Sequence, residues 1–161
     1  MSSSPEQKGE ASYQGESYTT VYLTIFGFRG EPDAYYKRHV LAYFQAPESN
    51  FCETVHVTRH DAKSPWEVNR VDVLVEWAMT ANISFNCDGG AFLVPRGQEK
   101  VLTNIMAAVP VMGRELDSGW NCQNFVLEGL TNLVAAKYQT KEWYTEVENK
   151  LIDYLLDRAV N

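Results

Sequence analysis

The chain has 161 residues, of which 45% are hydrophobic and 22% charged, so it is long enough for one domain with one buried core. Its formal charge of -7 argues against nucleic acid as a partner, because binding a phosphate backbone requires clustered Lys and Arg. The polar segment 1–18 lacks the apolar stretch of a secretory signal, and no apolar run reaches the ~20 residues of a membrane helix. We therefore expect a cytoplasmic chain without an integral membrane segment, in which a disordered tail over 1–18 precedes a single domain over 19–161.

The first half of this domain is rich in β-branched and aromatic residues, which favour strands. The strands that we predict are Thr19–Phe28, His39–Gln45, Cys52–Arg59, the first part of Val71–Phe85, and Phe92–Val94. A turn over Ala46–Ser49 separates the second strand from the third, because Pro47 presets a turn dihedral and cannot donate to a ladder.

The second half changes to helical periodicity. The predicted helices are Gln98–Val109, Cys122–Lys137 and Thr140–Val160, with Asn121 and Thr140 as N-caps of the last two. Strands followed by helices indicate an α+β domain, in which helices cover one face of an antiparallel sheet.

Three cysteines, Cys52, Cys87 and Cys122, occur without a signal peptide, which argues against a disulfide framework. No two of them have the C-x-x-C spacing of a zinc site, and no P-loop or dinucleotide motif is present, so we expect neither a metal nor a cofactor. For Cys52 and Cys87 the ordinary interpretation is a small buried hydrophobic residue.

Two of the three histidines are predicted to be neighbours across a hairpin. If the loop is Ala46–Ser49, counting outwards from it sets His39 opposite His56. Directly opposed residues share a face and have Cβ atoms only ~5 Å apart. A slip of one residue in this assumed register would send the two rings to opposite faces.

Cys122 is predicted to lie in the first turn of its helix, where the helix dipole and free N–H groups stabilise a thiolate. It shares a helix face with Phe125 and Val126, so we expect its thiol to point towards the sheet that carries the histidines. A thiolate, a base and a group that orients the base form the machinery of cysteine catalysis. The alternative is that Cys122 is simply part of the core.

The segment Trp120–Val126, WNCQNFV, resembles the NCEHFV helix start of the lecithin:retinol acyltransferase family, within the circularly permuted papain-like superfamily that includes NlpC-type peptidases. It also resembles small fungal proteins. The family order, a His at the start of a strand, a His on the next strand and a Cys opening a late helix, is matched by His39, His56 and Cys122. The resemblance implies a permuted papain-like fold with Cys122 as nucleophile, His39 as base and His56 as the orienting residue.

We therefore expect a thiol-dependent hydrolase or acyltransferase that acts on an ester, thioester or amide of a small-molecule or peptide substrate. Residues that could contact substrate are Trp120, Tyr35, Tyr36, Tyr43 and Gln123. The family's Glu-His after the Cys is Gln123-Asn124 here, so the third catalytic member is open among His56, Gln123 and Asn124. Two alternatives are a non-catalytic binding or interaction module on the same fold, and a small-metabolite cyclase or isomerase that uses the same pocket. The sequence leaves the oligomeric state open.

Overall fold

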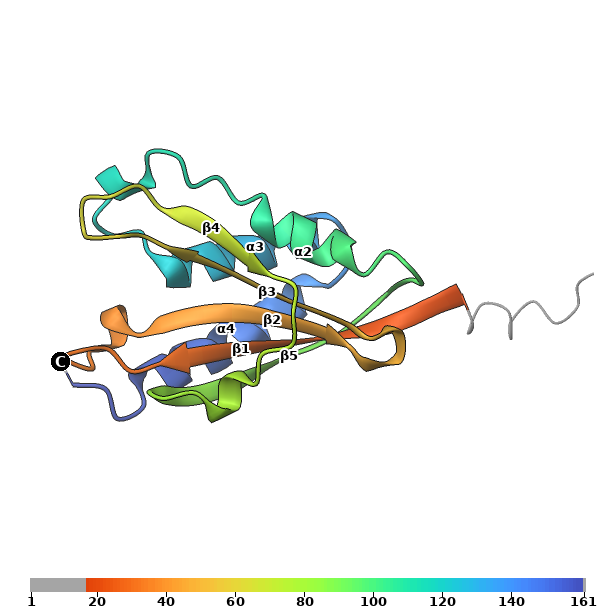
Figure 1. Cartoon of the computed structure of the whole chain (residues 1–161), viewed down its shortest axis with the longest axis horizontal. Coiled ribbons are helices and arrows are strands. Elements are labelled where there is room, and N and C mark those ends of the chain that lie inside the picture. Colours follow the sequence, from red (N-terminus) through yellow and green to blue (C-terminus); the bar gives the residue numbers. More distant parts are fainter. Residues whose placement is uncertain (1–16, 161) are drawn as a thin grey trace, which may run out of the picture.

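A computed structural model describes residues 17–160, which form a five-stranded antiparallel sheet and three α-helices (Figure 1). The strands are β1 Tyr18–Phe28, β2 His39–Ala46, β3 Phe51–Thr58, β4 Glu67–Val71 and β5 Ile83–Pro95. The helices are α2 Lys100–Ala107, α3 Cys122–Ala135 and α4 Lys141–Leu156. The predicted α+β class is therefore confirmed. The tail predicted over 1–18 lies outside the described residues except for its last two, and Tyr18 already belongs to β1.

The sheet has the strand order β4-β3-β2-β1-β5, which places β2 at its centre. The connection from β2 to β3 is a 3₁₀ turn at Pro47–Ser49, and Asn50 ends it with a φ of 57°. Asn tolerates this left-handed conformation better than most residues. The turn predicted at this position is confirmed, but Asn50 belongs to it instead of pairing with Gln45.

The side chains of each strand alternate between two faces of the sheet, as a pleated backbone requires. The helix face packs against the three helices in the main core, to which β2 contributes Val40, Ala42 and Phe44. We call the opposite side the outer face. It holds a smaller cluster of buried side chains, namely Phe26, Leu41 and Tyr43.

The strand predicted in the first part of Val71–Phe85 is wrong. This stretch is a loop between β4 and β5 that contains a 3₁₀ turn at Trp77–Met79. The side chains of Val73 and Leu74 are 59% and 63% exposed, whereas the indole of Trp77 lies on the outer face and donates to Thr54 Oγ1 at 2.9 Å. The loop thus covers the outer face of the sheet instead of adding a strand to it.

The three predicted helices are confirmed in position and each ends earlier than predicted. Asn121 caps α3 and Thr140 caps α4, each with its side chain accepting from a backbone N–H of the first turn. Within residues 17–160, none of the helices combines the length and the apolar character that crossing a membrane requires.

Candidate functional site

A cleft of about 830 Å³ lies at the end of the sheet where β2 begins and β3 ends. Its walls come from residues 35–39, from 57–59 with Trp66, and from 118–124. The ladder between β2 and β3 runs only from Ala42 opposite Val55 to Ala46 opposite Phe51, and the two strands diverge beyond it (Figure 1). The cleft therefore lies where the hydrogen-bonded ladder between β2 and β3 ends.

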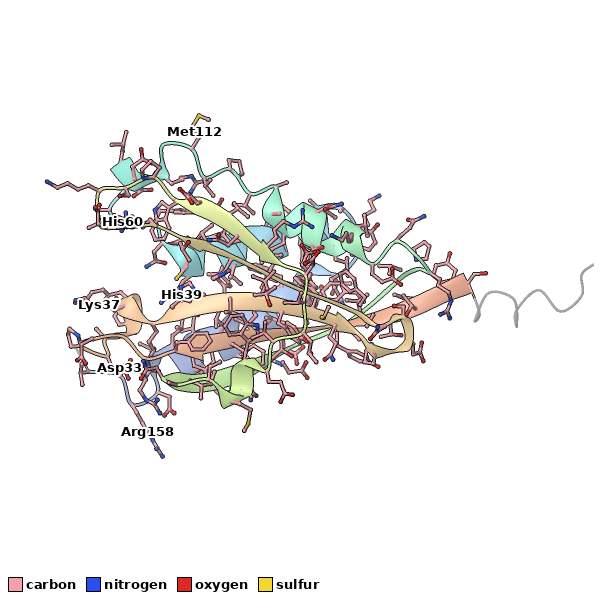
Figure 2. The ribbon with its side chains drawn as sticks, in the orientation of Figure 1. Asp33, Lys37, His39, His60, Met112 and Arg158 are labelled. Carbon is pink, nitrogen blue, oxygen red and sulfur yellow. The ribbon has the colours of Figure 1, made fainter. Side chains whose placement is uncertain are left out.

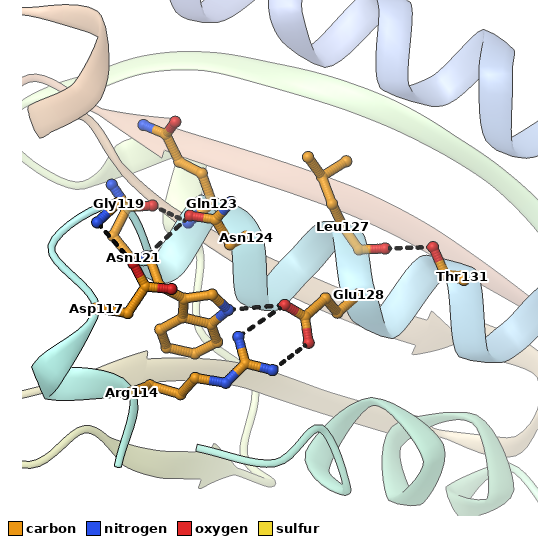
Figure 3. A network of polar contacts seen from close by, with 10 residues as sticks. Arg114, Asp117, Gly119, Asn121, Gln123, Asn124, Leu127, Glu128 and Thr131 are labelled. Carbon is orange, nitrogen blue, oxygen red and sulfur yellow. Dashed lines mark hydrogen bonds and ion pairs between the residues drawn. The ribbon is translucent and has the colours of Figure 1, made fainter. Parts of the chain in front are cut away.

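The start of α3 is fixed by a capping box (Figure 3). Asn121 Oδ1 accepts from the Gln123 backbone N–H at 2.9 Å, and Asn124 Oδ1 accepts from the Asn121 backbone N–H at 2.9 Å. These bonds satisfy N–H groups that every helix start leaves free. Cys122 is the first residue of α3, as predicted.

Side-chain amides fasten this helix start to the segment that leads into β2. Gln123 Nε2 donates to the carbonyl oxygens of Tyr35 and Arg38 at 2.7 and 2.9 Å. Asn121 Nδ2 donates to the carbonyl oxygen of Tyr36 at 3.3 Å. Gln123 was predicted to contact substrate, but its NH₂ group holds the cleft wall together. Asn124 is likewise committed to the cap.

The Cys122 thiol is 7% exposed, and its Sγ lies 3.9 Å from the Arg38 carbonyl oxygen. Burial raises the pKa of this thiol to about 11. The backbone N–H groups of Val40 and the helix start, together with the Arg59 cation, lower it by less. Desolvation thus outweighs the helix start, and the thiol is protonated at neutral pH.

His39 and His56 are neighbours, as predicted, with His39 Nε2 3.0 Å from His56 Nδ1. The register is two residues from the predicted one, because Tyr43 pairs with Thr54 and not with Cys52. A shift of two residues preserves the face, which is why the rings still meet. Burial, and secondarily the charge of His56, lowers the pKa of His39 to about 4, and burial also lowers the pKa of His56.

The histidine pair and the thiol pack against different clusters of the fold. His39 borders the cleft, but it pairs with Phe28 and stacks on its ring at 6.1 Å, and Phe28 in turn contacts Trp77 on the outer face. Cys122 belongs to the core on the helix face. Cys122 and His39 line the same cleft, and the thiol lies against the backbone on either side of His39, at the Arg38 carbonyl oxygen and the Val40 N–H. The catalytic role predicted for this pair stays a prediction.

The thiol of Cys122 contacts the backbone of Arg38, the residue before β2, and of Val40 within it. The guanidinium of Arg38 forms an ion pair with Asp33 at 2.8 Å and donates to the Tyr154 carbonyl oxygen of α4 at 2.9 Å. A guanidinium has no free lone pair for a proton, and valine has no titratable group. No general base for Cys122 is available from these two positions.

Among the predicted substrate contacts, Tyr35, Tyr36, Trp120 and Gln123 line the cleft. Tyr43 does not, because it lies in the buried cluster of the outer face.

Sequence reasoning missed two cations and one aromatic residue in the cleft wall: Lys37, Arg59 and Trp66. The Arg59 guanidinium carbon lies 4.1 Å from the centre of the Trp66 ring, and Trp66 meets Trp120 edge-on at 5.7 Å. Lys37 lies at the same end of the molecule as His39 (Figure 2). Only the position of Arg59 at the end of a predicted strand pointed to this wall.

In comparisons with protein-family models, curated proteins and solved structures, none matches this chain. We therefore describe the chain by its fold and its site. It is an α+β domain with an aromatic and cationic cleft at the start of α3. Within residues 17–160, no three His, Cys, Asp or Glu side chains gather in a group that could hold a metal ion.

Proposed function

We propose that this chain is a non-catalytic binding domain that takes a small molecule in the cleft at the start of α3. One observation carries this proposal: the cleft has a ligand-sized volume of about 830 Å³, and burial raises the pKa of the thiol in its wall to about 11, so the thiol is protonated at neutral pH. Pockets of about 300–1,000 Å³ are typical of small-molecule sites.

The rigidity of the wall supports binding. Trp120 Nε1 donates to Glu128 Oε2 at 2.7 Å, and Arg114 binds both oxygens of the same carboxylate at 3.0 Å (Figure 3). Arg114 also lies over the Trp120 ring at 4.7 Å. A wall that is held before the ligand arrives loses less conformational entropy on binding.

A fragment screen by ¹H–¹⁵N NMR tests the proposal. We expect hits that move the indole N–H resonances of Trp66 and Trp120, and that bind Cys122→Ala as tightly as the parent. Each hit should be recovered unchanged after long incubation with the protein. The absence of any hit at these resonances would contradict the binding function.

The second candidate is the thiol-dependent hydrolase or acyltransferase predicted from the sequence. The observation that favours it is the position of Cys122, which is the first residue of α3 and lines the cleft. Incubation with p-nitrophenyl acetate, followed by mass spectrometry, separates the candidates. An acetyl group that accumulates on Cys122, together with turnover that Cys122→Ala abolishes, would support the enzyme. Acetylation no faster than that of Cys52 and Cys87 would support the binding domain.

A further inference from the structure

We propose that the ligand of this cleft is an amphipathic anion: a small molecule with an aromatic or similar apolar body and one carboxylate or phosphate group. The inference rests on the proposed binding function and adds the chemical class of the ligand. It follows from the charges and the rings of the cleft wall.

The cleft wall is cationic although the chain is acidic. The sequence has 21 Asp and Glu against 14 Lys and Arg, yet the wall contains Lys37, Arg38 and Arg59 and no carboxylate. Arg38 is neutralised by Asp33. Neither Lys37 nor Arg59 forms an ion pair with any residue in 17–160. Lys37 and Arg59 therefore bring positive charge to the cleft wall without a direct ion pair, with Asp61 on the next loop acting on Arg59 only through space.

Arg59 is held in place for this role. One Nη1–H group donates to the Ala62 carbonyl oxygen at 2.9 Å, and the guanidinium lies over the Trp66 ring. Burial raises the pKa of the Cys122 thiol, and the charge of Arg59, which lines the same cleft, acts in the opposite direction. The other guanidinium N–H groups have no partner within the described residues and can donate to an anionic oxygen.

The remaining wall suits an apolar ring. Tyr35 and Tyr36 line the cleft, are 45% and 52% exposed and meet edge-on at 5.4 Å. Two further aromatic rings in the cleft wall belong to Trp66 and Trp120. Trp66 Nε1 is buried without a hydrogen-bond partner within 17–160, and a ligand acceptor that reached it would satisfy this donor. Aromatic rings pack on such walls edge-to-face or offset.

The test is a titration of the full chain with three probes that share one ring system: 1-naphthaleneacetate, its neutral amide 1-naphthaleneacetamide, and 1-naphthyl phosphate. The Trp66 and Trp120 indole resonances report binding in the cleft. We expect at least one anion to bind about tenfold more tightly than the amide, with affinity that falls as NaCl is raised. Preference for one anion over the other identifies the head group and supports the class.

Substitutions locate the charge. Arg59→Gln should weaken binding of the preferred anion about tenfold and leave binding of the amide unchanged. Lys37→Gln should act in the same direction with a smaller effect. Lys63→Gln is the matched control, because it removes one charge from the same exposed loop outside the cleft and should change neither affinity. Dispersed amide resonances verify folding, and the salt dependence of the parent decides the question if a variant unfolds.

Two results would overturn the inference. Equal affinity of the amide and both anions in the cleft would remove the anionic class while leaving the binding function intact. Failure of all three probes to move the Trp66 and Trp120 resonances would remove the aromatic anion as ligand, and the fragment screen then decides the binding function separately.

Discussion

The helix face and the outer face of β2 differ in chemistry although they alternate residue by residue. On the helix face, Arg38 and Val40 lie beside a buried, protonated Cys122. On the outer face, His39 lies against His56 among aromatic rings, and burial keeps both imidazoles neutral. The comparison teaches that burial, as well as the order and spacing of Cys and His residues, decides whether a thiol is activated. The face of the strand on which each residue lies decides which side chains meet.

Arg38→Ala should produce the largest effect and would show that the helix face is structural. The side chain is 2% exposed and joins Asp33 to the end of α4. Its removal leaves buried acceptors without a partner, which costs about 3–5 kcal/mol for a broken buried pair. Urea denaturation measures this loss of unfolding free energy. Arg158→Ala serves as the exposed control, and a loss below about 1 kcal/mol for Arg38→Ala would contradict this role.

The outer face should be sensitive to pH. A buried base with a lowered pKa binds its proton more readily in the unfolded state, so stability falls as pH drops below the unfolded value of 6.5 towards about 4. Between pH 7 and pH 5, His39 should account for a loss of about 2 kcal/mol in unfolding free energy. Carboxylates with lowered pKa values, such as Asp33 and Glu53, stay ionised in this window.

Comparing His39→Gln with the parent by denaturation at pH 7 and pH 5 checks the prediction, because the variant should lose most of this pH dependence. His60→Gln is the control, since His60 lies outside the pair. An unchanged pH dependence in His39→Gln would mean that His39 is not the buried neutral base of the outer face.

The smallest predicted effect compares two helix caps. Asn121→Ala and Thr140→Ala should each cost about 1 kcal/mol of unfolding free energy, because each removes an N-cap acceptor. Only Asn121→Ala should move the indole resonance of Trp120, since Asn121 also binds the Tyr36 carbonyl oxygen across the cleft. If both variants moved the Trp120 indole resonance equally, the hydrogen bond from Asn121 to the Tyr36 carbonyl oxygen would not hold the cleft wall.

The sequence allowed the class, the helix starts and the histidine contact to be predicted, because periodicity and capping residues are local signals. It did not reveal the face of His39. Strand β2 is apolar on both sides, with Val40 and Ala42 on one and Leu41 on the other, so alternation alone does not tell which side meets the helices.

Two further differences depend on tertiary contacts. The turn lies one residue further along the chain than predicted and ends at Asn50 in a left-handed conformation, which moves the register by two residues. The stretch that contains Val73 and Leu74 alternates in sequence as a strand would. In the structure it is a loop, and Trp77 anchors this loop on the outer face. The cleft combines three distant segments, and its cations could not be assigned to one site before the ends of β2 and β3 were placed.

The protonated state of the buried Cys122 thiol is tested most directly by the pH dependence of Cys122 alkylation with iodoacetamide, read by mass spectrometry in the parent and in His39→Gln. The structure predicts slow alkylation with a midpoint near 11, identical in both proteins. A midpoint well below the ~8.5 of a free thiol, lost in His39→Gln, would contradict the protonated thiol and establish an activated cysteine–histidine pair.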